Sequence, residues 1–354
     1  MTVTVFSTLS RTICATALAA TACNIATVLP ATSNTDAAGA AFDGQLGPAA
    51  PDGAAQPAGA AGAGSWLACG ELADAYCARL QACHPHVFEI DYASLPACKE
   101  REQLRCSVLL GAPDAQGSTA TFAACRASIA AAPCDGIEPH GPPRCWFGPG
   151  KRAAGKACSV DTQCAGRFCK AEFGKPCGVC AAVATSGEPC SSGQCEDGLA
   201  CVFDKPAKGM RCRAPAPVGG DCTTAAGAES ACGYDLGCNG ATCAAASTKA
   251  GDPCAPTGCD HARGFTCSQA TQKCVAITMK APGASCSMNG MGGSDWSECH
   301  DGLCLNQNDM GNGTCKAYAA DGAPCKAWEG PGCRHPATCR ADKCVLPPNL
   351  ACAP

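Results

Sequence analysis

The chain of 354 residues contains 36 cysteines, but only 5% of its residues are aromatic and 16% are charged. Much of its hydrophobic 47% is Ala and Cys, which bury little area each, so the composition argues against one large conventional core. The net charge of -4 is spread without long runs of one sign, which argues against a nucleic-acid surface or a polybasic membrane patch. Cysteine at this density is typical of disulfide scaffolds, and the length indicates several small units in series.

Residues 1–22 have the outline of a secretory signal. Arg11 precedes an apolar stretch, Thr12–Ala22, that is too short to span a membrane. The ending "AATAC" resembles the lipobox of bacterial lipoproteins, which predicts lipidation at Cys23; cleavage of a plain signal nearby is the alternative. Without Cys14 and with Cys23 lipidated, 34 cysteines remain, an even number that can pair completely.

Residues 23–65 are rich in Ala, Gly and Pro and have no periodicity, as in "DAAGAAFDGQLGPAAPDGAAQPAGAAGAG". Such a segment has too little apolar surface to offset the entropy of ordering. We therefore expect a flexible tether with a root-mean-square span of roughly 35 Å.

Residues 66–150 form a block with eight cysteines and a helical texture. Three short helices are predicted from "WLACGELADAYCARLQAC", "LPACKEREQLRCSVLL" and "STATFAACRASIAAAPC", the last opening with a Ser/Thr cap signal. In the first helix, an apolar stripe is expected to contain Leu67, Leu72, Tyr76 and Leu80.

An antiparallel arrangement of the first two helices predicts a nested pair of disulfides in this block. Cys83 would face Cys98 near the connecting loop, and Cys77 would face Cys106 further out. Eight cysteines allow about 105 connectivities, so other pairings remain open.

Residues 151–354 contain six cysteine-rich repeats of about 32 residues. Each begins with a glycine three residues before its first cysteine, and the first four intervals are 32 residues and the last is 39. A fixed period of this size is the mark of tandem modules. The six glycines are Gly155, Gly187, Gly219, Gly251, Gly283 and Gly322.

Within each repeat, a turn before the third cysteine predicts a short β-hairpin. Two bridges can replace the core that so short a segment cannot build, and the favoured pairing joins the first cysteine to the third and the second to the fourth. In the second repeat these pairs are Cys190–Cys201 and Cys195–Cys212. The first repeat has a fifth cysteine and Cys352 follows the sixth repeat; whether these two pair is left open.

The "G-x-x-C-x5-C-x4-C" texture between Gly155 and Cys344 resembles the N-terminal cysteine-rich domain of Dickkopf proteins and the colipase-type fold. The whole layout is similar to hypothetical secreted proteins of myxobacteria that carry a helical cysteine block before such repeats. The resemblance implies a small disulfide-rich fold with little regular secondary structure. It implies no activity and no functional residue.

The cysteines do not have the spacing of metal ligands. "CGVC", at Cys177 and Cys180, is the only C-x-x-C, and it lacks the βαβ context of a redox pair. His84 and His86 form an H-x-H in a predicted loop, which is more often exposed polarity than a metal site. No motif of a common hydrolase, metalloprotease or dinucleotide-binding protein occurs, so we expect neither catalysis nor a cofactor nor a metal.

The favoured hypothesis is a secreted or outer-surface lipoprotein that acts as a rigid, non-enzymatic scaffold for a protein or glycan partner. A released inhibitor or toxin-like effector is the alternative, and a metal-binding protein is a distant third. The fifth repeat has a long first loop that carries Met288, Met291 and Trp296 among glycines. This loop is the candidate binding site. The alternative is that the loop has no binding role, because an insertion in a surface loop has a small free-energy cost and Trp296 would then cover its own module.

Overall fold

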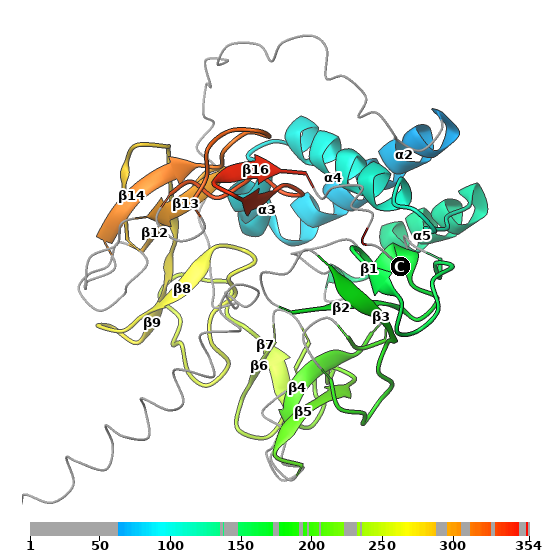
Figure 1. Ribbon diagram of the computed structural model, residues 1–354. Helices are drawn as coiled ribbons and strands as arrows, with labels where there is room; N and C mark the ends of the chain where they lie inside the picture. Colours follow the sequence, from blue (N-terminus) through cyan, green and yellow to red (C-terminus); the bar gives the residue numbers. More distant parts are fainter. Residues whose placement is uncertain are drawn as a thin grey trace, which may run out of the picture.

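In the residues that it describes, the computed structural model shows four helices followed by an arc of small β-hairpin sheets (Figure 1). It describes residues 63–134, 137, 148–172, 177–190, 194–196, 198–204, 207–222, 232–233, 236–287, 296–305, 312–326, 330–346 and 352. The predicted signal and nearly all of the predicted tether lie outside this part of the chain. No helix in the described part is long and apolar enough to cross a membrane.

The helical block contains four helices where the sequence predicted three. They are α2 (Ala63–Cys83), α3 (Pro85–Tyr92), α4 (Leu95–Leu110) and α5 (Thr119–Ala131). Helix α3 was missed, although Pro85 at its first turn is a typical start signal. The expected cap is confirmed: Ser118 accepts a hydrogen bond from the Thr121 backbone N–H, and Ser94 caps α4 in the same way.

The block has its own core between α2 and the two helices that pack on it, α4 and α5. Leu72, Tyr76 and Leu80 are fully buried, as their spacing predicted. Leu67 is 69% exposed, so its place in the apolar stripe was wrong. It lies more than a turn before Leu72, at the edge of the contact between α2 and α5.

The predicted bridges of this block are wrong in their partners. Cys77 pairs with Cys98, and Cys69 pairs with Cys106, while Cys83 pairs with Cys134 beyond α5. Helix α3 lengthens the connection between α2 and α4, which displaces Cys98 from Cys83. Cys69 and Cys77 are eight residues apart and so are Cys98 and Cys106, so both bridges join antiparallel helices at equal intervals, about 12 Å of rise.

Six modules follow the helical block, and each is built on a β-hairpin. We define them as modules 1 to 6, with bounds Gly155–Cys180, Gly187–Cys212, Gly219–Cys243, Gly251–Cys274, Gly283–Cys315 and Gly322–Cys344. The elements are β1 (Ala157–Cys158), the 3-10 turn η3 (Asp161–Gln163), β2 (Arg167–Ala171), β3 (Gly178–Ala182), β4 (Ala200–Asp204), β5 (Gly209–Arg213), β6 (Leu236–Cys238), β7 (Cys243–Ala245), β8 (Phe265–Ser268), β9 (Lys273–Ala276), β10 (Thr278–Lys280), β11 (Ser285–Ser287), β12 (Ser297–Cys299), β13 (Gly302–Leu305), β14 (Asn312–Ala317), β15 (Thr338–Arg340) and β16 (Lys343–Val345).

The recurring glycine has a structural reason. In all six modules its φ is positive, between 78° and 90°, in the region that favours glycine. Its backbone N–H donates to the carbonyl of the last hairpin cysteine, as Gly187 does to Cys212 at 2.8 Å. The glycine therefore turns the chain so that each module closes onto its own hairpin.

The crossed disulfide pattern is confirmed in every module. The third and fourth cysteines are direct cross-strand partners, as Cys201 and Cys212 are, but they do not bond to each other. They bond instead to the first and second cysteines, giving Cys190–Cys201 and Cys195–Cys212 in module 2. The same order occurs elsewhere as Cys158–Cys169, Cys164–Cys180, Cys222–Cys238, Cys232–Cys243, Cys254–Cys267, Cys259–Cys274, Cys286–Cys304, Cys299–Cys315, Cys325–Cys339 and Cys333–Cys344.

The two cysteines outside this pattern close the array. Cys177 of module 1 pairs with Cys352, 175 residues later, so the chain returns to the first module (Figure 1). The helical block joins the same two ends of the arc. The Thr162 hydroxyl in module 1 donates to the Leu109 carbonyl at 2.8 Å, and Arg101 of α4 binds the Arg334 and His335 carbonyls in module 6.

Candidate functional site

Helix α3 carries a histidine into the contact between the helical block and modules 4 and 5. The backbone N–H of His86 donates to the Ala262 carbonyl of module 4 at 3.1 Å. Gly264 has φ +74°, and a Cβ there would lie 2.8 Å from His86 Nδ1. Glycine is thus required at position 264 both for the turn and for the close approach of the imidazole ring.

Two histidines and one glutamate converge at this contact. His86 Nε2 lies 2.9 Å from Glu298 Oε2, and His261 Nε2 lies 3.1 Å from Glu298 Oε1. The two imidazole rings meet edge to face with centroids 5.2 Å apart. The Trp296 indole N–H donates to Glu298 Oε1 at 3.2 Å. We call these four residues the His–Glu cluster.

The cluster is largely buried, and His261 is the most exposed of its three ionisable side chains. Side-chain exposure is 6% for His86, 9% for Glu298 and 19% for His261. Burial raises the pKa of the Glu298 carboxyl, but the hydrogen bonds and charges of the two histidines outweigh it and hold that pKa well below its usual range. Glu298 is therefore ionised at neutral pH.

A second polar contact lies beside the cluster, between α4 and the last modules. Arg101 forms a two-pronged ion pair with Asp321, with N–O distances of 2.8 and 2.9 Å. Arg334 of module 6 pairs with Asp301 of module 5. Burial, with the nearby Glu102 and Asp301 carboxylates, raises the pKa of Asp91 to about 7. These groups fix the orientation of the helical block on the modules.

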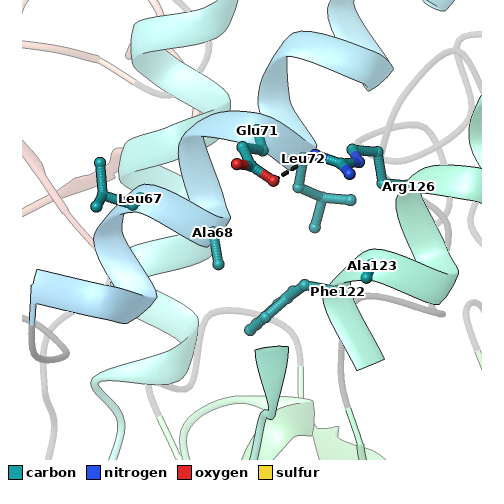
Figure 2. A pocket seen from close by; sticks show the side chains of 7 residues that line it. All are labelled: Leu67, Ala68, Glu71, Leu72, Phe122, Ala123 and Arg126. Atoms are coloured by element: carbon teal, nitrogen blue, oxygen red, sulfur yellow. Dashed lines mark hydrogen bonds and ion pairs between the residues drawn. The ribbon is translucent and has the colours of Figure 1, made fainter. Parts of the chain in front are cut away.

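A groove lies between α2 and α5 on the other side of the helical block. Figure 2 shows Leu72 and Phe122 at its base and a Glu71–Arg126 ion pair across its upper end. Leu67 and Ala68 form one wall and Ala123 lies opposite. This groove presents apolar side chains beside one pair of charges, without a nucleophile or a paired acid and base among its lining residues.

The cysteine sulfurs do not form a metal site in the described residues. Sets of three sulfurs meet inside the modules, as Cys158, Cys164 and Cys180 do. All 33 described cysteines are disulfide-bonded, Cys125 included, so they offer no thiolate, which is the form that binds metals. "CGVC" is divided between two bridges, Cys177–Cys352 and Cys164–Cys180, and is not a redox pair.

The predicted site residues have different outcomes. Cys23, Met288 and Met291 lie outside the described residues. Trp296 is half-buried, and its indole is hydrogen-bonded within its own module. His84 and His86 do not share a site: His84 Nε2 contacts the Ile137 carbonyl at 3.0 Å, whereas His86 reaches Glu298.

Sequence reasoning missed His261 and Glu298. They are 37 residues apart and 212 residues separate His86 from Glu298, so no local spacing could have joined them. The remaining signal is weak: His261 and Glu298 lie within two residues of the module cysteines Cys259 and Cys299, whereas His86 lies in α3 outside the modules.

No family model, curated protein or solved structure matches the chain. The resemblance to Dickkopf and colipase-type repeats therefore stays a prediction. The class that the structure defines is a cysteine-rich protein with many disulfides, four helices and small β-hairpin sheets.

Proposed function

We propose that this protein is a secreted or outer-surface scaffold that binds a protein or glycan partner and catalyses no reaction. Its disulfide density supports an oxidising compartment, since such bridges form and persist outside the reducing cytosol. A lipid on Cys23 would hold it at the membrane, and residues 24–62 would give it reach.

The observation that carries the proposal is the covalent closure of the module array. The Cys177–Cys352 bridge and the helical block tie the first and last modules together, so the loops of six modules are displayed on one stapled frame. Such a frame limits the backbone entropy lost on binding, because disulfides already hold the strands that carry the loops. The binding loop of module 5 begins directly after Ser287 of β11 and ends at Trp296, which the His–Glu cluster anchors.

Cell fractionation tests the location. We expect the wild-type protein in the membrane fraction and Cys23→Ala in the soluble extracellular fraction, because several acyl chains anchor stably where none would remain in the variant. Wild-type protein that is already free in the medium would favour the released inhibitor or effector instead.

Binding of labelled mature protein to cells tests the activity. We expect saturable binding that is lost when the labelled protein is reduced and alkylated. Loss of binding to cells pretreated with protease would indicate a protein partner, and loss after periodate would indicate a glycan partner. The double variant Met288→Ser, Met291→Ser tests whether the loop contributes to this binding, because it removes both methionine side chains and leaves Trp296 and the cluster intact. Absence of saturable binding to any pretreated or untreated cells would contradict the proposal.

A further inference from the structure

We propose that His86, His261 and Glu298 form a zinc site that fastens the helical block to modules 4 and 5. No motif in the sequence indicated a metal, and the zinc proposal does not rest on the proposed binding function. It brings together one ligand from α3, one from module 4 and one from β12.

The ligand set and its geometry suit zinc. Two imidazole nitrogens and one carboxylate are a recurrent zinc ligand set, with Zn–N and Zn–O distances of about 2.0–2.2 Å and a fourth position open to water. Tetrahedral ligands at those distances are roughly 3.3 Å from one another. The Nε2 atoms of His86 and His261 already lie 2.9 and 3.1 Å from the Glu298 oxygens, so small side-chain shifts suffice.

The surroundings supply the outer contacts that metal sites need. The Trp296 indole N–H bonds to the glutamate and would orient it as a ligand. The Ala262 carbonyl holds the backbone at His86, and Gly264 lets the His86 ring pack against module 4. His261 is the most exposed of the three ligands, with 19% side-chain exposure.

Charge also favours a cation. The Glu298 carboxyl group is almost fully buried, with 9% side-chain exposure, and a buried carboxylate is stable only with a compensating charge and hydrogen bonds. A zinc ion would supply that charge where the two Nε2 atoms meet the carboxylate. In the zinc-bound site each histidine would bind the ion through the Nε2 lone pair and carry its ring proton on Nδ1.

The experiment uses the oxidised mature protein, stripped with a chelator and dialysed against ZnCl2. We expect one zinc per chain by elemental analysis, and a visible absorption spectrum with cobalt(II) that lacks the thiolate charge-transfer band. His261→Ala should weaken binding by about 100-fold or more, because losing a ligand exceeds the roughly 10- to 100-fold effect of losing an outer contact. Trp296→Phe, which removes only the outer hydrogen bond, should weaken it by roughly 10-fold.

His300→Ala is the matched control, since it removes a histidine of module 5 outside the cluster. Peptide mapping without reduction and circular dichroism establish that each variant is folded. If His261→Ala does not fold, Glu298→Gln, which keeps the shape and hydrogen-bonding capacity of the side chain, replaces it. Zinc content below about one per ten chains, or equal affinity in the folded cluster variants and His300→Ala, would overturn the proposal.

Discussion

Replacing both Cys177 and Cys352 by serine removes the bond that closes the module array. The other bridges stay intact, so each module keeps its crossed staples and only the link between the two ends of the array is lost. Cys177 is exposed, so serine at that position leaves no cavity. Cys352 is buried, but serine is close to cysteine in size, so the loss of closure is the main effect of the double variant.

The expected loss follows from loop entropy. The bridge joins residues 175 apart, but the intact module bridges shorten the covalent path between them to roughly 100 links. For such a loop the chain-entropy relation gives about 4.7 kcal/mol, and residual structure in the unfolded chain lowers this toward about 3 kcal/mol. The control Cys190→Ser, Cys201→Ser opens an 11-residue loop, for which the same relation gives about 3 kcal/mol from local closure alone.

Guanidinium unfolding without reductant measures both variants. Circular dichroism follows the helices, and tryptophan fluorescence reports on both parts of the protein, because Trp66 lies in α2 and Trp296 in module 5. We expect the closure variant to lower the free energy of the transition that releases the helical block, because α4 contacts module 6 and the α4–α5 connection contacts module 1. The local control should mainly loosen module 2. A decrease in the free energy of unfolding of less than about 1 kcal/mol in the closure variant would refute the reasoning, because opening the loop would then not raise the conformational entropy of the unfolded chain.

Two further predictions concern single residues. Gly187→Ala should lower the free energy of unfolding by about 1–2 kcal/mol. The cause would be backbone strain alone, because φ at Gly187 is +83° and an added Cβ would meet no atom within 4 Å. Gly209→Ala in β5 of the same module is the control and should change the free energy of unfolding little. The folded protein keeps a proton on Asp91 up to about pH 7, whereas the unfolded chain releases it near pH 4. Stability should therefore fall as pH rises from about 4 to 7, and Asp91→Asn should flatten that slope in pH-dependent unfolding; an unchanged slope would contradict the assignment.

The sequence alone determined the local parts of this protein. The 32-residue period, the glycine before each first cysteine and the crossed staples of the modules could be predicted because each involves residues close in the chain. A short segment with four cysteines has few ways to close, and a hairpin places its two cysteines side by side. The cap at Ser118 and the buried face of α2 were predictable for the same reason.

Tertiary structure decided everything that joins distant segments. The bridges of the helical block depended on α3, which shifted the partner of Cys98 from Cys83 to Cys77. Equal spacings of eight residues on α2 and α4 were visible in the sequence, but they select the pairing only once the helices are known to be antiparallel. The Cys177–Cys352 closure and the meeting of His86 with Glu298 have no local signal, because contacts between segments 175 and 212 residues apart are set by how the modules pack against the helices.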